Sequence, residues 1–101
     1  LKDADKSIKF YVKKNIEENS LILKKENKVI LNQFFFNQSH EVIFRSLNEI
    51  LNIVGNRYYP VRGKSLNLII SKILSGFLKK STLGGCFIEK INHTVIISKE
   101  A

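Results

Sequence analysis

The stretch QFFFNQSHEVIFRSLNEILNIVGN, residues 33–56, carries the strongest periodic pattern of the chain. Its apolar positions recur at helical spacing and predict one long amphipathic helix. Asn37 or Ser39 can cap the start of this helix, because short polar side chains accept hydrogen bonds from the first free N–H groups. Gly55 occupies the position after the last apolar residue of the stripe, where a left-handed C-cap is expected to end the helix. The buried stripe predicted for this helix is Ile43, Leu47, Ile50, Leu51 and Val54. We expect the preceding run of three phenylalanines, residues 34–36, to pack in the core rather than to stack on nucleobases.

The segments on either side of this helix complete a helix, hairpin, two-helix, hairpin pattern. Residues 3–17 predict a first helix, and KKEN allows a turn between two short strands. Pro60 bars a helix through the connector that follows residue 56. The remaining predicted elements are strands at 21–24 and 28–31, a third helix at about 63–78, and strands at about 83–90 and 94–98 around INH. The predicted buried side of the third helix is Leu66, Ile69, Ile70, Ile73, Leu74 and Phe77. We therefore expect an α+β fold, a small mainly helical domain with about three helices and two short β-hairpins.

Composition indicates a single globular domain over residues 1–101. The 101 residues are 44% hydrophobic and 26% charged, which is typical of a chain that folds around a modest core. No apolar run approaches the roughly 18 residues of a membrane-spanning helix, and the first residues lack a signal-peptide pattern. One cysteine forms no internal disulfide, so we expect a reducing, cytoplasmic setting and no membrane partner. The chain contains no methionine, and we expect it to be a fragment of a longer polypeptide.

The net charge of +8 is distributed unevenly. No acidic residue lies between Glu49 and Glu89. An interval of this kind produces a field of one sign, which attracts polyanions such as nucleic acid. The alternative is a chance consequence of a lysine-rich composition. The cations of this interval are Arg57, Arg62, Lys64, Lys72, Lys79 and Lys80.

The connector NRYYPVRGK, residues 56–64, combines cations with adjacent aromatic side chains. Arginine binds phosphate oxygens through two parallel hydrogen bonds, and a tyrosine can stack on an exposed base. The alternative for Tyr58 and Tyr59 is that both rings wedge the connector into the core. The cations are then the only groups left to bind a partner.

The stretch TLGGCFIEK, residues 82–90, raises three possibilities: a phosphate loop, a reactive thiol and one half of a structural hairpin. A phosphate loop places its glycines between a strand and a helix, whereas these glycines follow a helix and lead into a strand. Cys86 lacks a recognisable base nearby in sequence, so a buried, inert thiol is favoured. The glycines are interpreted as permitting a bend or bulge close to another backbone. We expect no catalytic, cofactor-binding or metal-binding residue in this chain.

The string from FRSLNEIL through YYPVRGKSLNLII to TLGGCFIEKINHTVIISKE resembles the region that follows the catalytic domain in bacterial tRNA(Ile)-lysidine synthetases. In that family an arginine-bearing helix precedes a proline-containing connector, a further helix and a hairpin of the LGGC type. The resemblance covers about residues 38–100. The matching positions are Arg45, Pro60, Arg62, Leu66, 83–88 and 95–100.

The resemblance implies a parent ligase that uses ATP, with magnesium, to attach lysine to the wobble cytidine of an isoleucine tRNA. The ATP loop of that family has no counterpart here, so no residue is assigned to ATP, and the catalytic domain becomes a partner in the same polypeptide. This chain would bind and position tRNA. The residues expected to contact tRNA are Arg57, Arg62, Lys64, Lys72, Lys79 and Lys80, with Arg45 either contacting tRNA or pairing within the structure. Two alternatives are a protein–protein or intramolecular docking module, and an independent enzyme that uses Cys86.

Overall fold

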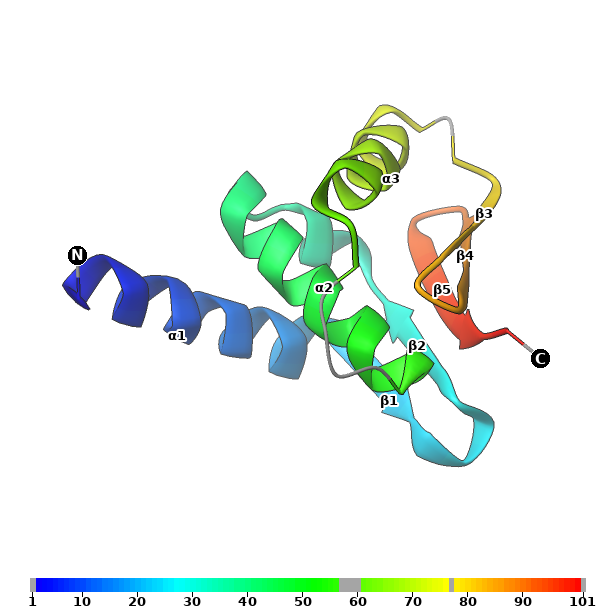
Figure 1. Cartoon of the computed structure of the whole chain (residues 1–101), viewed down its shortest axis with the longest axis horizontal. Helices are drawn as coiled ribbons and strands as arrows, with labels where there is room; N and C mark the ends of the chain where they lie inside the picture. The colour runs from blue at the N-terminus through cyan, green and yellow to red at the C-terminus, as the bar shows by residue number, and fades with distance from the viewer. Residues whose placement is uncertain (1, 57–60, 77, 101) are drawn as a thin grey trace.

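The computed structural model describes residues 2–56, 61–76 and 78–100. The order of elements confirms the α+β class and the helix, hairpin, two-helix, hairpin sequence (Figure 1). Short 3-10 turns, η1 and η2, accompany the first hairpin. The elements are α1 (Lys2–Asn19), β1 (Ser20–Leu23), η1 (Lys24–Glu26), β2 (Lys28–Leu31), η2 (Gln33–Phe36), α2 (His40–Gly55), α3 (Gly63–Ser75), β3 (Lys80–Leu83), β4 (Cys86–Ile91) and β5 (Thr94–Lys99).

Helix α2 forms where the periodic stripe predicts it, and its ends refine that prediction. The Ser39 hydroxyl accepts a hydrogen bond from the Val42 N–H at 3.4 Å, which makes Ser39 the N-cap. The left-handed C-cap is Asn56, with φ 54°, while Gly55 is the last helical residue. The prediction of Gly55 as the cap is therefore wrong by one residue. Asparagine takes the left-handed region more readily than most side chains, so the cap does not need glycine.

The strands form one antiparallel sheet in the order β1-β2-β5-β4-β3. The two hairpins expected as separate units join through β2 and β5, where Val29 lies opposite Ile97 and Leu31 opposite Val95. All four side chains are buried. This central pairing makes the sheet continuous, so the hairpins share one hydrophobic core.

The glycine pair forms a tight turn between β3 and β4. Gly84 and Gly85 have φ values of 64° and 77°, and Leu83 pairs with Cys86 across them. A two-residue hairpin with positive φ at both central positions matches the twist of its strands, and glycine adopts it without steric strain. The predicted strand over 83–90 is therefore wrong, because a turn interrupts it and β3 precedes it. A Cβ on Gly85 would meet nothing within 4 Å, so its φ rather than a close backbone approach requires glycine there.

Helices α2 and α3 cover one face of the sheet and bury the core against it (Figure 1). All five predicted stripe positions of α2 are buried, as are Leu66, Ile69, Ile70 and Ile73 of α3. The prediction fails at Leu74, which is 55% exposed. The predicted end of this helix at about residue 78 is also wrong, because Gly76 takes a left-handed conformation and α3 ends at Ser75. Among the three phenylalanines Phe35 is buried and Phe36 packs against the core, but Phe34 is exposed. The burial predicted for Phe77 lies outside the described residues.

Helix α1 packs on α2 through its C-terminal part, and its N-terminal part projects from the body of the domain (Figure 1). Val12 is buried, whereas Tyr11 is half exposed and Phe10 is 60% exposed. None of the helices within the described residues combines the length and apolar character needed to cross a membrane.

Candidate nucleic-acid interface

Helix α3 presents a solvent-facing side that carries cations, amides and hydroxyls but no carboxylate. The buried stripe from Leu66 to Ile73 fixes which side faces the core, because residues three and four apart share one helix face. The opposite positions are exposed along the length of the helix. The polar residues of this face, which we call the α3 polar face, are Lys64, Asn67, Ser71, Lys72 and Ser75, and the exposed Leu68 lies among them. Lysines, hydroxyls and amides are the side chains that commonly bind phosphate oxygens.

Four of the sequence-predicted cations lie on α3 or immediately beside it. Arg62 occupies the position before the first helical residue, Lys64 lies in the first turn, and Lys72 lies in the last turn. Lys79 lies three positions after Gly76 and directly before β3. All four side chains are exposed. We call Arg62, Lys64, Lys72 and Lys79 the α3 cation set.

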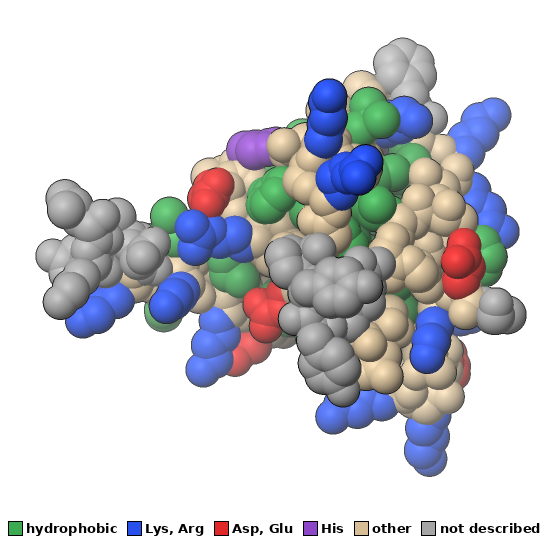
Figure 2. All heavy atoms as spheres, viewed as in Figure 1, with side chains coloured by type: hydrophobic (Ala, Val, Ile, Leu, Met, Phe, Trp, Pro, Cys, Tyr) green, Lys and Arg blue, Asp and Glu red, His purple; other side chains and the backbone are tan. Residues whose placement is uncertain are grey.

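No described carboxylate neutralises the α3 cation set. Within the described residues the ion pair that forms is Arg45–Glu41, with Nε and Oε1 2.7 Å apart. Figure 2 shows the Lys and Arg side chains over α3 without an Asp or Glu side chain between them. An uncompensated group of cations raises the local concentration of polyanions.

Two other predicted cations do not join this set. Arg45 lies on α2, pairs with Glu41 and borders a hollow against α1 rather than α3. Lys80 lies in the sheet opposite Glu89, and its Nζ stands 4.9 Å from the centre of the Phe87 ring. Because side chains alternate across a strand, Lys80 and Phe87 face away from the buried side that holds Cys86 and Ile88. The prediction that groups Lys80 with α3 is therefore wrong in its geometry.

The predictions that concern Arg57, Tyr58, Tyr59 and Pro60 lie outside the described residues. The connector is described again from Val61, whose side chain is buried in the core. The Val61 N–H donates to the Asn48 side-chain oxygen at 3.3 Å, which attaches the end of the connector to α2. This anchor fixes where α3 begins and therefore where Arg62 and Lys64 are presented.

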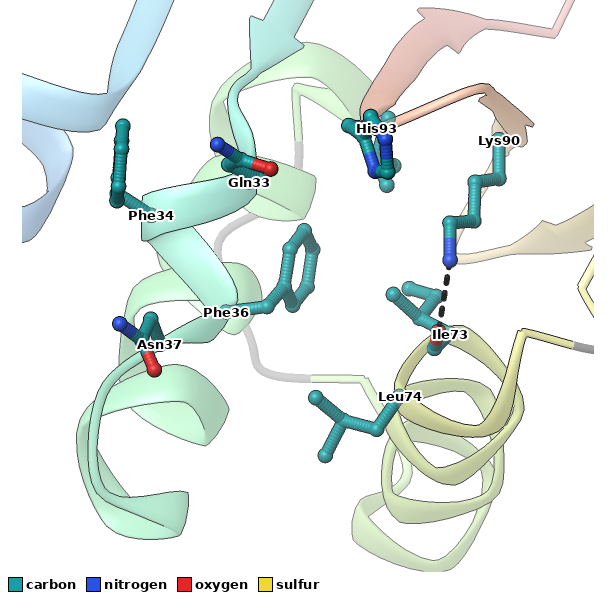
Figure 3. Close-up of a pocket in the computed structure, with 9 residues that line it drawn as sticks. Gln33, Phe34, Phe36, Asn37, Ile73, Leu74, Lys90 and His93 are labelled. Atoms are coloured by element: carbon teal, nitrogen blue, oxygen red, sulfur yellow. Dashed lines mark hydrogen bonds between the residues drawn. The ribbon is translucent and has the colours of Figure 1, made fainter.

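Lys90 is a cation at this interface that the acid-free interval did not include. Its Nζ donates to the Ile73 carbonyl at 3.2 Å, at the C-terminal end of α3, and the same carbonyl accepts from the Gly76 N–H at 3.2 Å (Figure 3). The Lys90 N–H also donates to the Lys79 carbonyl at 3.1 Å, so the two lysines are neighbours across the sheet. Strand alternation could have predicted Lys90 on the same face as Cys86 and Ile88, but not the helix end that it reaches.

Cys86 and His40, two side chains of types that can act in catalysis, both make contacts that hold the fold together. The Cys86 side chain is fully buried, and its Sγ lies 3.6 Å from the Leu51 carbonyl oxygen. His40 Nε2 lies 2.9 Å from Asn67 Oδ1, which connects the start of α2 to α3. The structural hairpin is thus the one of the three possibilities for residues 82–90 that the geometry confirms. Comparison with protein-family models, curated proteins and solved structures found no match.

Proposed function

We propose that this chain is the tRNA-binding domain of an ATP-dependent ligase that attaches lysine to the wobble cytidine of an isoleucine tRNA. The domain binds the tRNA body through the α3 cation set and positions the anticodon loop for a separate catalytic domain. It performs no chemistry itself. The single observation that carries the proposal is an exposed helix face whose cations have no carboxylate partner among the described residues.

The dimensions of α3 suit contact with several phosphates. Its 13 residues span about 20 Å at 1.5 Å per residue, with Lys64 near one end and Lys72 near the other. Asn67 and Ser71 lie between them and supply neutral donors. Contacts of this kind position an RNA without reading its sequence, because phosphates are the same at every nucleotide. A positioning role is what a modifying enzyme requires of a domain outside its active site.

We expect this chain to bind tRNA in a strongly salt-dependent manner. With about four phosphate contacts, affinity falls roughly a hundredfold between 50 and 200 mM salt, because each contact releases condensed counterions. Titration of labelled tRNA at several salt concentrations measures the slope. No binding at low salt, or an affinity that does not change with salt concentration, would contradict the proposal.

A charge-matched pair of variants tests the location of the interface. The triple variant Lys64→Gln, Lys72→Gln and Lys79→Gln should lower the magnitude of the log–log salt slope by about 3. The control carries the same change at Lys24, Lys25 and Lys28, which lie in the exposed turn region of the first hairpin. Both variants lose three positive charges, so a general charge effect weakens them equally. Equal weakening would contradict an interface on α3.

The ligase assignment has a separate test in the coding sequence of the parent protein. An ATP-loop domain encoded upstream of Leu1 supports it, and a parent that lacks such a domain contradicts it. This test does not depend on whether the isolated domain binds RNA.

A docking module is the second candidate function, supported by the apolar surface of α1. Phe10 and Tyr11 form an edge-to-face pair with ring centres 5.3 Å apart, and both are at least half exposed. Exposed aromatic pairs are typical of surfaces that another protein covers. Under this function the glutamine variants of the α3 cation set have no effect on assembly, whereas Phe10→Ser weakens it.

A further inference from the structure

A hollow of about 300 Å³ opens between η2, the end of α3 and the β4–β5 turn. We infer that this hollow holds one unstacked nucleotide of the bound RNA, an inference that rests on the proposed function. It adds recognition of an unpaired position to the phosphate contacts of α3. Figure 3 shows the side chains that surround the hollow converging from these three elements.

The apolar walls of the hollow suit the flat face of a base. The Phe36 ring projects from η2 toward α3, where Leu74 stands across from it (Figure 3). Phe36 packs edge-to-face on the buried ring of Phe35, with centres 5.0 Å apart, so its orientation is held by the core. Base stacking on aromatic rings is the usual means by which proteins hold unpaired nucleotides. Leu74 is 55% exposed, which leaves an apolar surface at the mouth for a ligand to cover.

The polar groups at the rim match the edge of a base. Gln33 and Asn37 line the side formed by η2, and His93 lines the side formed by the β4–β5 turn. Neither amide side chain makes a hydrogen bond within the described part of the chain, and both residues are exposed. An amide offers both donors and an acceptor, the combination that base edges present in return. These groups favour a nucleobase over a purely apolar occupant.

The hollow adjoins one member of the α3 cation set, Lys79, through Lys90. Lys90 lines the hollow, and because an ammonium has three donors, its bond to the Ile73 carbonyl leaves two for a phosphate. The Lys79 carbonyl accepts the Lys90 N–H, and because the two residues pair across the sheet, both side chains lie on the side of the sheet that faces the hollow. No Asp or Glu is among the lining residues. A strand that follows these lysines passes the mouth of the hollow, where one base can turn inward.

Two RNA hairpins that share the same tightly structured tetraloop test the inference, one with an uninterrupted stem and one with a single bulged nucleotide in its stem. The chain should bind the bulged hairpin about tenfold more tightly, the range expected for one stacked base. Leu74→Trp fills the hollow and should abolish this preference. Leu68→Trp is the matched control, because Leu68 is 56% exposed on the same helix but does not line the hollow. Thermal unfolding of both variants verifies that the fold is kept.

The outcomes separate this inference from the proposed function. Salt-dependent binding of both hairpins with equal affinity overturns the nucleotide site and leaves the tRNA-binding domain standing. Loss of the preference in Leu68→Trp as well as in Leu74→Trp also overturns the site. Failure to bind either hairpin or tRNA overturns both proposals. As a second measurement, a 4-thiouridine placed at the bulge should crosslink within residues 33–37, and crosslinks confined to α1 would contradict the inference.

Discussion

At the scale of single residues, backbone conformation decides several positions that hydrophobic patterns do not address. Three asparagines adopt positive φ, each directly after or within a turn: Asn27, Asn56 and Asn92. Glycines 76, 84 and 85 do the same. Residues without a Cβ, or with a short side-chain amide, tolerate this region best. The placement of these two residue types therefore marks where helices and strands of this chain end.

We expect Gly85→Ala to destabilise the fold by about 1–2 kcal/mol, because alanine resists the left-handed conformation. The effect isolates backbone strain, since an added Cβ would meet no atom within 4 Å. Gly63→Ala is the control: its Cβ would stand 3.5 Å from the Phe44 ring, an ordinary contact, in the first helical position of α3. That variant should be neutral or more stable by up to about 1 kcal/mol. Urea unfolding of both compares the two, and equal destabilisation would contradict the strain argument.

At the scale of elements, a buried polar link attaches α1 to the rest of the domain. Asn15 is 2% exposed, and its Nδ2 donates at 3.2 Å both to the Phe35 carbonyl of η2 and to the Ser46 hydroxyl of α2. Asn19 Nδ2 donates in turn to Asn15 Oδ1 at 2.8 Å. A satisfied buried network of this kind fixes the orientation of α1, which its thin apolar stripe does not do alone.

We expect Asn15→Ala to lower the free energy of unfolding by about 2 kcal/mol, because it leaves the Phe35 carbonyl and the Ser46 hydroxyl without this donor. Asn37→Ala serves as a control, since Asn37 is exposed and should change stability by less than about 0.5 kcal/mol. Denaturant unfolding measures both. A double-mutant cycle between Asn15→Ala and Ser46→Ala should show a coupling free energy, and strictly additive effects would contradict the link.

At the scale of the whole molecule, the sheet unites segments from both ends of the chain. The Cα radius of gyration is 12.8 Å, close to the roughly 13 Å typical of a compact domain of this length. Cys86 is fully buried in this arrangement, at the start of β4 against the Leu51 carbonyl of α2. Its exposure requires the sheet to separate from α2.

Labelling of the Cys86 thiol should therefore be slow at neutral pH and should follow global unfolding. Pulsed labelling across a urea gradient should trace the same transition as the loss of helical circular dichroism, because both report one cooperative core. The reagent reacts promptly with the fully unfolded chain, which controls for reagent activity. Rapid labelling of the folded chain would favour the independent Cys86 enzyme and would contradict the burial argument.

The long helices were predictable because their information is local. The stripes of α2 and α3 set both their periodicity and their buried faces, and Pro60 with the surrounding polar residues marks the break between them. The boundary errors at the ends of α2 and α3 and at the start of the last hairpin have a common origin. Each depends on which residue takes positive φ, and the periodic pattern carries no information about that choice.

The sequence predicted most of the cations of the candidate site, but not how they are arranged in space. The acid-free interval identified Arg62, Lys64, Lys72 and Lys79, but the same interval included Lys80, which the sheet turns toward its other face. The acid-free interval did not include Lys90, because Lys90 follows Glu89 in the sequence. Its position beside Lys79 and the end of α3 comes from strand pairing and helix docking.

The amino-acid sequence by itself determined the α+β class, the buried stripes of the helices and the one-signed charge of the interval between Glu49 and Glu89, because periodicity and charge are properties of neighbouring residues. Only the tertiary structure decided that the two hairpins form one sheet and that η2, α3 and the β4–β5 turn border a hollow. It also decided that Lys80 and Arg45 lie apart from the α3 cation set. These features depend on contacts between segments far apart in the chain. Burial of a shared core selects those contacts, and no local pattern encodes them.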